Sequence, residues 1–173
     1  MNTHIQLKDI SIMNTICDTC KHDFTSHSFN LISNTQNAGH VFYTKISNAS
    51  KYDDTEGIVK HCTNYLNFIK PQNKWSWIID FDGFGLKHTL GINTGIQLSK
   101  LINNTGNLKN LFVINTNVFV EQMLKMIKLT LNKEYHHCIV IIKNNNNFIN
   151  EINEKWIILD NNKKLLINAI CNS

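Results

Sequence analysis

The sequence WSWIIDFDGFG at residues 75–85 decides the fold of this chain. Its first five residues are mostly apolar. Two aspartates and two glycines follow, with a phenylalanine between the members of each pair. A run of this kind favours a strand that is buried on both faces and stops at the edge of a sheet. In an open α/β sheet, ligands bind at that edge. The end of this strand is therefore a candidate position for a ligand site.

Two further apolar runs, at residues 111–117 and 136–142, resemble this one. Segments with helical periodicity separate the three runs, which predicts the order strand, helix, strand, helix, strand. This order is typical of a mainly parallel sheet with right-handed crossovers and helices packed against it. The sequence therefore predicts an α/β fold.

A β-hairpin is expected before this unit. The runs at residues 28–33 and 40–46 are rich in β-prone residues, and turn formers separate them. Residues 53–70 then show apolar side chains at helical spacing, and Asp53 or Asp54 is the expected N-cap. The complete expectation is a mainly parallel β-sheet with flanking helices and an N-terminal hairpin.

Composition limits the classes of function. The 173 residues predict one domain, and its net charge of +4 comes from 17 lysines without any arginine. Because nucleic-acid contacts favour the guanidinium group, we expect no nucleic-acid partner. The excess of asparagine, isoleucine and lysine is typical of an AT-rich genome. No segment has the length of a membrane span and the first residues lack a signal pattern, so we expect a soluble, cytoplasmic protein with reduced cysteines.

Four potential metal ligands lie within the first 28 residues: Cys17, Cys20, His22 and His27. Such side chains bind zinc when their spacing is suitable. Cys17 and Cys20 have the spacing of a zinc knuckle, but His22 follows closely and no second well-spaced pair is present. We favour two reduced thiols and two surface histidines, and we expect no metal ion and no cofactor.

Residues 118–132 form an unusual predicted helix. Its apolar stripe is too broad for a helix that lies on a sheet with one face in water. Such a stripe, with Met123 and Met126 in it, suits an element that covers a deformable apolar cavity. A well-buried core helix explains the same pattern, and periodicity alone favours that interpretation.

An enzymatic hypothesis starts from Asp80 and Asp82 at the end of an apolar strand. They resemble the first motif of the haloacid dehalogenase phosphatases, in which one aspartate attacks phosphorus, the other handles the leaving-group proton, and magnesium lies between them. Candidate partners are Thr116, Lys133 or Lys143, and Asp160. However, the motif lies far from the chain start, and two asparagines follow Asp160 where that family has acids. This phosphatase is kept as an alternative.

A longer series of segments resembles the CRAL-TRIO lipid-binding domain, the family of phosphatidylinositol transfer proteins and of tocopherol and retinaldehyde carriers. GHVFY at 39–43 matches the family's opening strand, with His40 in place of proline. Residues 53–68 match the next helix, and WIIDFDGF at 77–84 matches the central strand. The later matches are LFVIN at 111–115, the gate helix at 119–131 and the strand at 136–142.

The resemblance covers residues 39–142 and implies a domain at 29–173 after an N-terminal extension at 1–28. The family's helical N-terminal subdomain and its Leu-Pro-x-x-x-Gly-Gly closing segment are missing. Residues 155–171 would have to replace the closing segment.

The mechanism that this resemblance implies is binding without chemistry, so we do not expect an enzyme. A phospholipid or similar lipophile would lie in an apolar cavity between the sheet and the gate helix, and it would leave when that helix opens at a membrane. Lysines around the helix would attract an anionic surface: Lys125, Lys128 and Lys133. The expected pocket residues are Phe81, Phe84, Phe112, Ile114, Phe119, Met123 and Ile127.

On this interpretation Asp80 and Asp82 are structural, and one of them caps the turn beside Gly83. A second alternative is a scaffold that binds other proteins and whose cavity is filled by bulky side chains. The candidates for such filling are Trp75, Trp77 and Phe84. The lipid and the oligomeric state are not predicted.

Overall fold

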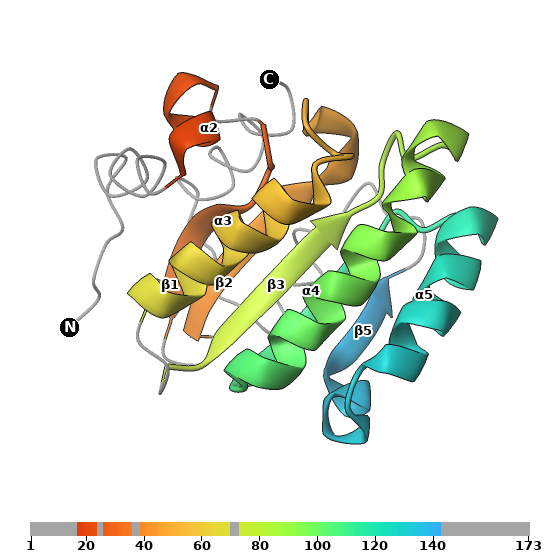
Figure 1. Cartoon of the computed structure of the whole chain (residues 1–173). Helices are drawn as coiled ribbons and strands as arrows, with labels where there is room; N and C mark the ends of the chain where they lie inside the picture. Colours follow the sequence, from red (N-terminus) through yellow and green to blue (C-terminus); the bar gives the residue numbers. More distant parts are fainter. Residues whose placement is uncertain (1–16, 24–25, 36–38, 70–72, 143–173) are drawn as a thin grey trace.

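In the computed structural model, residues 17–23, 26–35, 39–69 and 73–142 are described, and they form a five-stranded sheet covered on one face by helices (Figure 1). Lys143, Asp160 and the segment at 155–171, which the sequence interpretation used, lie outside the described residues.

The sheet is mainly parallel and follows the order of the chain. Its strands lie side by side as β1-β2-β3-β4-β5, with β1 antiparallel to β2 and the other pairs parallel. The bounds are β1 Asn30–Thr35, β2 Gly39–Lys45, β3 Trp75–Asp80, β4 Leu108–Ile114 and β5 Ile139–Ile142. The predicted α/β class and the N-terminal hairpin are confirmed.

Gly39 fixes the point at which β2 begins. Its φ is +68°, and a Cβ built there would lie 1.8 Å from the carbonyl oxygen of Lys74. The next amide, His40 N–H, donates to that same carbonyl at 3.0 Å. Only glycine combines this dihedral with so close an approach of two backbones.

The helices connect the parallel strands as predicted. The α-helices are α2 Asp18–His22, α3 Thr55–Phe68, α4 Ile92–Thr105 and α5 Val118–Thr130. The 3₁₀ segments are η1 Ile46–Asn48, η2 Leu86–Gly91 and η3 Lys133–Cys138. Asp54 is the N-cap of α3, and its carboxylate accepts the N–H of Gly57. In the part of the chain that the structure describes, no helix combines the length and the apolarity needed to cross a membrane.

The last strand begins later than predicted. The apolar run at 136–142 was expected to be extended throughout, but β5 begins at Ile139 because η3 occupies the preceding residues. His136 Nε2 lies 3.1 Å from the carbonyl oxygen of Leu131, so its ring contacts the end of α5 instead of standing on a strand.

The two faces of the sheet differ in what covers them. Trp75 and Trp77 of β3 belong to the core that packs against α3, α4 and α5, which lie together on one face (Figure 1). Ile78 and Asp80 alternate with them and are buried on the opposite face. Parallel pairing places Ile78 beside Phe112 and Asp80 beside Ile114, so these β4 residues share the opposite face.

Helix α5 is not the well-buried core helix that periodicity alone favours. It buries only Val120 and Met123, whereas Val118 is 71% and Leu129 is 86% exposed. The helix lies at the edge of the layer and packs on α4, where Gly95 admits the side chain of Ile127 (Figure 1). A helix with a neighbour on one side cannot bury a stripe of this width.

Candidate functional site: an apolar cavity beneath α5

A cavity of about 470 Å³ lies between the sheet and the helices. Trp77, Ile79 and Leu111 contribute to it from the sheet, and most of its other walls come from α4, α5 and the loop after β3. This volume falls within the roughly 300–1,000 Å³ of small-molecule sites, and the lining is mostly apolar, as in such sites.

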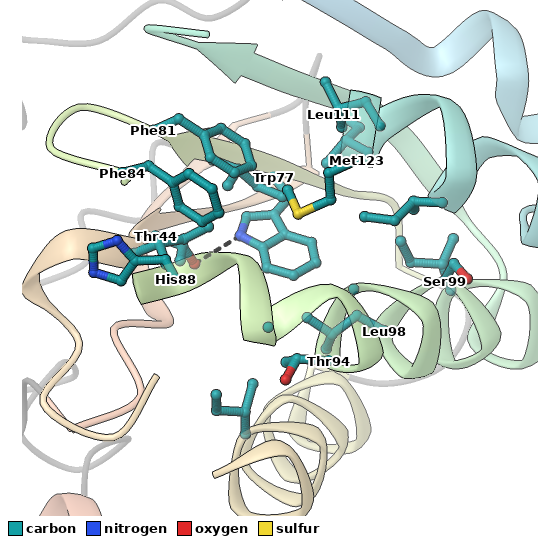
Figure 2. Close-up of a pocket in the computed structure, with 18 of the residues that line it drawn as sticks. Thr44, Trp77, Phe81, Phe84, His88, Thr94, Leu98, Ser99, Leu111 and Met123 are labelled. Carbon is teal, nitrogen blue, oxygen red and sulfur yellow. Dashed lines mark hydrogen bonds between the residues drawn. The ribbon is translucent and has the colours of Figure 1, made fainter. Parts of the chain in front are cut away.

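Trp77 is held at the centre of the cavity wall. Its indole Nε1–H donates to Thr44 Oγ1 at 2.9 Å, so the ring keeps its one polar atom paired while its faces remain apolar. Figure 2 shows Phe81 and Phe84 on one side of this ring and Leu98 of α4 on another. The rings of Phe81 and Phe84 meet edge to face, with centroids 5.2 Å apart.

Four of the seven expected pocket residues line this cavity: Phe81, Phe84, Met123 and Ile127. The two phenylalanines come from the turn after β3, and the other two lie on the inner side of α5. Met123 points toward Trp77 across the cavity (Figure 2). Whether these residues contact a lipid stays a prediction.

The other three expected residues lie elsewhere. Phe112 and Ile114 are fully buried, but the alternation of β4 directs them to the face opposite the helices, while Leu111 lines the cavity. Phe119 is 50% exposed on the outer side of α5. These three residues belong to elements that border the cavity, but they lie on faces that do not line it.

His88 is a polar residue of the cavity wall that the sequence interpretation did not single out. It is 2% exposed, and the backbone N–H of Gly85 donates to its Nδ1 at 3.0 Å. The neutral ring therefore carries its proton on Nε2, which has no hydrogen-bond partner among the described residues. Burial lowers the pKa of His88, and the charge of Lys87 lowers it further, so the ring stays neutral near pH 7. A lone histidine in a short 3₁₀ segment gives no sequence signal of this position.

Two of the three bulky side chains that could fill the cavity form part of its wall. Trp77 and Phe84 line it, and Trp75 is buried in the core with its Nε1–H donating to the carbonyl of Gly106 at 2.8 Å. Charged side chains of α5 reach its rim, namely Glu121, Lys125 and Lys128.

Asp80 and Asp82 are engaged in structural interactions. Asp80 is 2% exposed, and its carboxylate accepts hydrogen bonds from Tyr43 Oη (2.7 Å), Asn115 Nδ2 (2.9 Å) and the backbone N–H of Asp82 (2.8 Å). Asp82 is paired with Lys45 Nζ at 2.9 Å. The expected turn cap beside Gly83 is therefore Asp80.

A cluster of sulfur and nitrogen atoms adjoins the cavity through His27, and its members are Cys17, Cys20, His27 and His61. His27 is 3% exposed, which corrects the expectation of two surface histidines, whereas His22 is exposed as expected. His61 comes from α3, where it occupies a position on the buried face between Ile58 and Tyr65. His61 lies far from the N-terminal segment in the sequence, so ligand spacing does not predict it as a member of the cluster.

Burial controls the ionisation of this cluster. It raises the pKa of the Cys20 thiol to about 12, with the neighbouring Cys17 adding to the effect, and it lowers the pKa of His61 to about 4. Both groups are therefore neutral near pH 7 unless a cation lies beside them.

Comparisons with known proteins support the fold and the family. A model of the CRAL/TRIO domain matches residues 37–158. The crystal structure of Sfh5 superposes with a TM-score of 0.59 at 10% sequence identity, covering 83% of this chain and 56% of that one. This chain thus spans little more than half of that protein's chain, and at this identity the likeness shows the fold alone. No curated protein matches the sequence.

Proposed function

The chain belongs to the CRAL/TRIO domain family, whose members bind lipophilic small molecules, and we propose that it holds a lipid in the cavity beneath α5 and releases it at membranes. The observation that carries this proposal is the 470 Å³ apolar cavity itself.

The driving force for binding is the removal of hydrocarbon from water. Each buried methylene contributes about 0.8 kcal/mol, so a long chain enters a preformed apolar cavity with a large gain. Trp77, Leu98 and Met123 offer flat and flexible apolar surfaces for such a chain. The filled-cavity scaffold has less support, because its two nearest candidate plugs, Trp77 and Phe84, leave this space open.

The polar group of the wall suggests one feature of the ligand. A buried N–H without a partner costs about 1–3 kcal/mol, and the Nε2–H of His88 is such a donor among the described residues. A ligand with an acceptor oxygen, such as an ester or ketone carbonyl, would recover this cost. We infer a lipophile with an oxygen near His88 rather than a pure hydrocarbon.

Helix α5 is suited to act as the gate. Its inner side lines the cavity, and its outer side exposes Val118, Phe119, Met126 and Leu129. On a helix of 3.6 residues per turn these four positions fall within about 100° of one another, so they form one apolar face. A membrane surface would accept that face, with exposed Lys125 and Lys128 adding attraction to anionic lipids.

The contacts of Asp80 are consistent with a protein that binds a ligand without catalysing a reaction. All the polar contacts described for Asp80 are to the protein itself, and it stands on the face of the sheet opposite the cavity. The phosphatase alternative needs this carboxylate to reach a substrate, which its burial opposes.

The test is extraction of the purified full chain with organic solvent, followed by mass spectrometry of the extract. We expect a lipid in roughly stoichiometric amount from the wild type. Met123→Asp places a charge in the apolar wall and should lower the recovered lipid at least about tenfold, because burying an unpaired carboxylate is strongly unfavourable.

Met126→Asp is the matched control, because Met126 lies on the outer face of the same helix and is 49% exposed. It should retain the lipid, and circular dichroism should show that both variants fold. An empty extract from the folded wild type, or equal lipid in the two variants, would refute the assignment of the cavity.

A further inference from the structure

Four side chains from distant parts of the chain converge at one buried point, and we propose that they bind a zinc ion as a closed structural site. Cys17, Cys20 and His27 come from the N-terminal segment, and His61 comes from α3. Their ligand atoms all lie within 4.8 Å of one another. No other group of three or more histidine, cysteine or acidic side chains is placed in this way among the described residues.

Three sulfur–nitrogen distances within the cluster match those of a zinc tetrahedron. Cys17 Sγ and Cys20 Sγ lie 3.5 and 3.6 Å from His27 Nδ1, and Cys20 Sγ lies 3.5 Å from His61 Nδ1. With Zn–S near 2.3 Å and Zn–N near 2.0–2.1 Å, a sulfur and a nitrogen at tetrahedral angles are about 3.6 Å apart. The side chains therefore need little movement to enclose the ion.

Both histidines present the correct nitrogen. His61 Nε2 lies 3.2 Å from the carbonyl oxygen of Phe29, and His27 Nε2 lies 3.4 Å from the carboxylate of Asp54. A proton on each Nε2 satisfies these acceptors and leaves the lone pair of each Nδ1 directed at the sulfurs. Histidines that ligate metals are oriented by such partners, including the carboxylate–histidine pair formed here by Asp54.

Thiol hydrogen bonds alone do not account for the arrangement. Two thiols carry two protons, but the cluster contains three close sulfur–nitrogen contacts and both nitrogens are acceptors. One contact then brings two lone pairs together. A cation at the centre makes all three contacts favourable.

The donor set selects the metal and the kind of site. Two sulfurs and two imidazole nitrogens in a tetrahedron favour zinc, whereas calcium and magnesium require oxygen ligands. Four protein ligands leave no open position, which is typical of structural rather than catalytic zinc. A surface pocket of about 240 Å³ beside Cys17 and His27 offers the ion a route to the site.

The proposed zinc site joins two parts of the fold. It ties the N-terminal segment to α3, and His27 also lines the lipid cavity. Zinc would therefore fix one end of the cavity wall. Because ligands so far apart in sequence meet only in the folded chain, the affinity for zinc adds to the stability of the fold.

The experiment uses the full chain without a polyhistidine tag, expressed with zinc in the medium. Metal analysis by plasma mass spectrometry should find about one zinc ion per chain in the wild type and almost none in Cys20→Ser. The matched control is His22→Asn, because His22 belongs to the same segment but is exposed and outside the cluster. It should retain zinc as the wild type does.

Two further measurements cover the case in which Cys20→Ser folds poorly. Cobalt(II) added to chelated wild type should give the visible bands of a tetrahedral thiolate site, and His61→Asn should lose them. Chelation should lower the Tm of the wild type by roughly 5–10 °C and leave that of His61→Asn unchanged. The proposal would be overturned if the wild type bound neither metal, or if Cys20→Ser held as much zinc as the wild type. A disulfide between Cys17 and Cys20 in place of the metal would overturn it as well.

Discussion

Asp80 is the residue at which the end of the central strand is fixed to its neighbours. Its carboxylate joins Tyr43 of β2, Asn115 after β4 and the turn that follows β3. A buried carboxylate with several donors stabilises the fold only while its donors remain in place. The motif that suggests a catalytic pair in the sequence is thus a structural junction.

Replacing Asp80 with alanine should lower the free energy of unfolding by about 3 kcal/mol, because it removes the acceptor shared by Tyr43 and Asn115. Urea denaturation monitored by fluorescence measures the change. Asp82→Ala is the matched control, since its pair with Lys45 is 63% exposed on the aspartate side and contributes less than about 1 kcal/mol. Equal losses in the two variants would contradict the role given to Asp80.

Helix α5 has two apolar sides with different surroundings. The side that holds Met123 and Ile127 lines the cavity, and the side that holds Phe119 and Leu129 faces outward. A helix that buries so little of its surface against its neighbours can move at a modest cost. This is the property that a gate requires.

The outward face of α5 should carry membrane contact. Leu129→Asp should weaken binding to vesicles of phosphatidylcholine and phosphatidylserine roughly tenfold or more, because Leu129 is 86% exposed and would lose its transfer into the lipid interface. Sedimentation with vesicles measures this. Phe68→Asp serves as control, since Phe68 is also exposed, at 59%, but lies on α3. If both substitutions weaken binding alike, α5 is not the contacting element.

The cavity is the space that the side chains of the sheet and of its helices leave unfilled between the two layers of the molecule. Gly91 stands at the junction of η2 and α4 and lines this space. A Cβ added there meets no atom within 4 Å, and its φ of −73° suits any residue. The position is therefore open to a larger side chain without strain in the backbone.

Gly91→Phe should fill part of the cavity, lower the amount of lipid recovered on extraction at least several-fold and leave the Tm unchanged or slightly higher. Gly85→Phe is the control, because Gly85 also has open space around its Cα but does not line the cavity. Undiminished lipid in Gly91→Phe would mean that the lipid lies elsewhere.

The elements and their order follow from the local pattern of residues along the chain. Local periodicity and turn chemistry predicted the hairpin, an α3 cap at Asp53 or Asp54 and the parallel strands, because these depend on residues close together in the chain. The ordered series of segments also identified the family, which the domain match at 37–158 confirms. The start of β5 was missed, since contacts of His136 with α5 override the local preference.

Which side chains meet depends on the packing of elements that are far apart in the chain. Phe112 and Ile114 lie on a strand of the site but point to its other face, a choice set by the register of β4 against β3. His61 meets Cys20 across 41 residues of sequence because α3 packs against the segment before β1, where His61 Nε2 lies 3.2 Å from the carbonyl oxygen of Phe29, and no spacing rule reaches that far. Periodicity fixes an element and its apolar side, whereas the meeting of side chains from separate elements depends on how those elements pack.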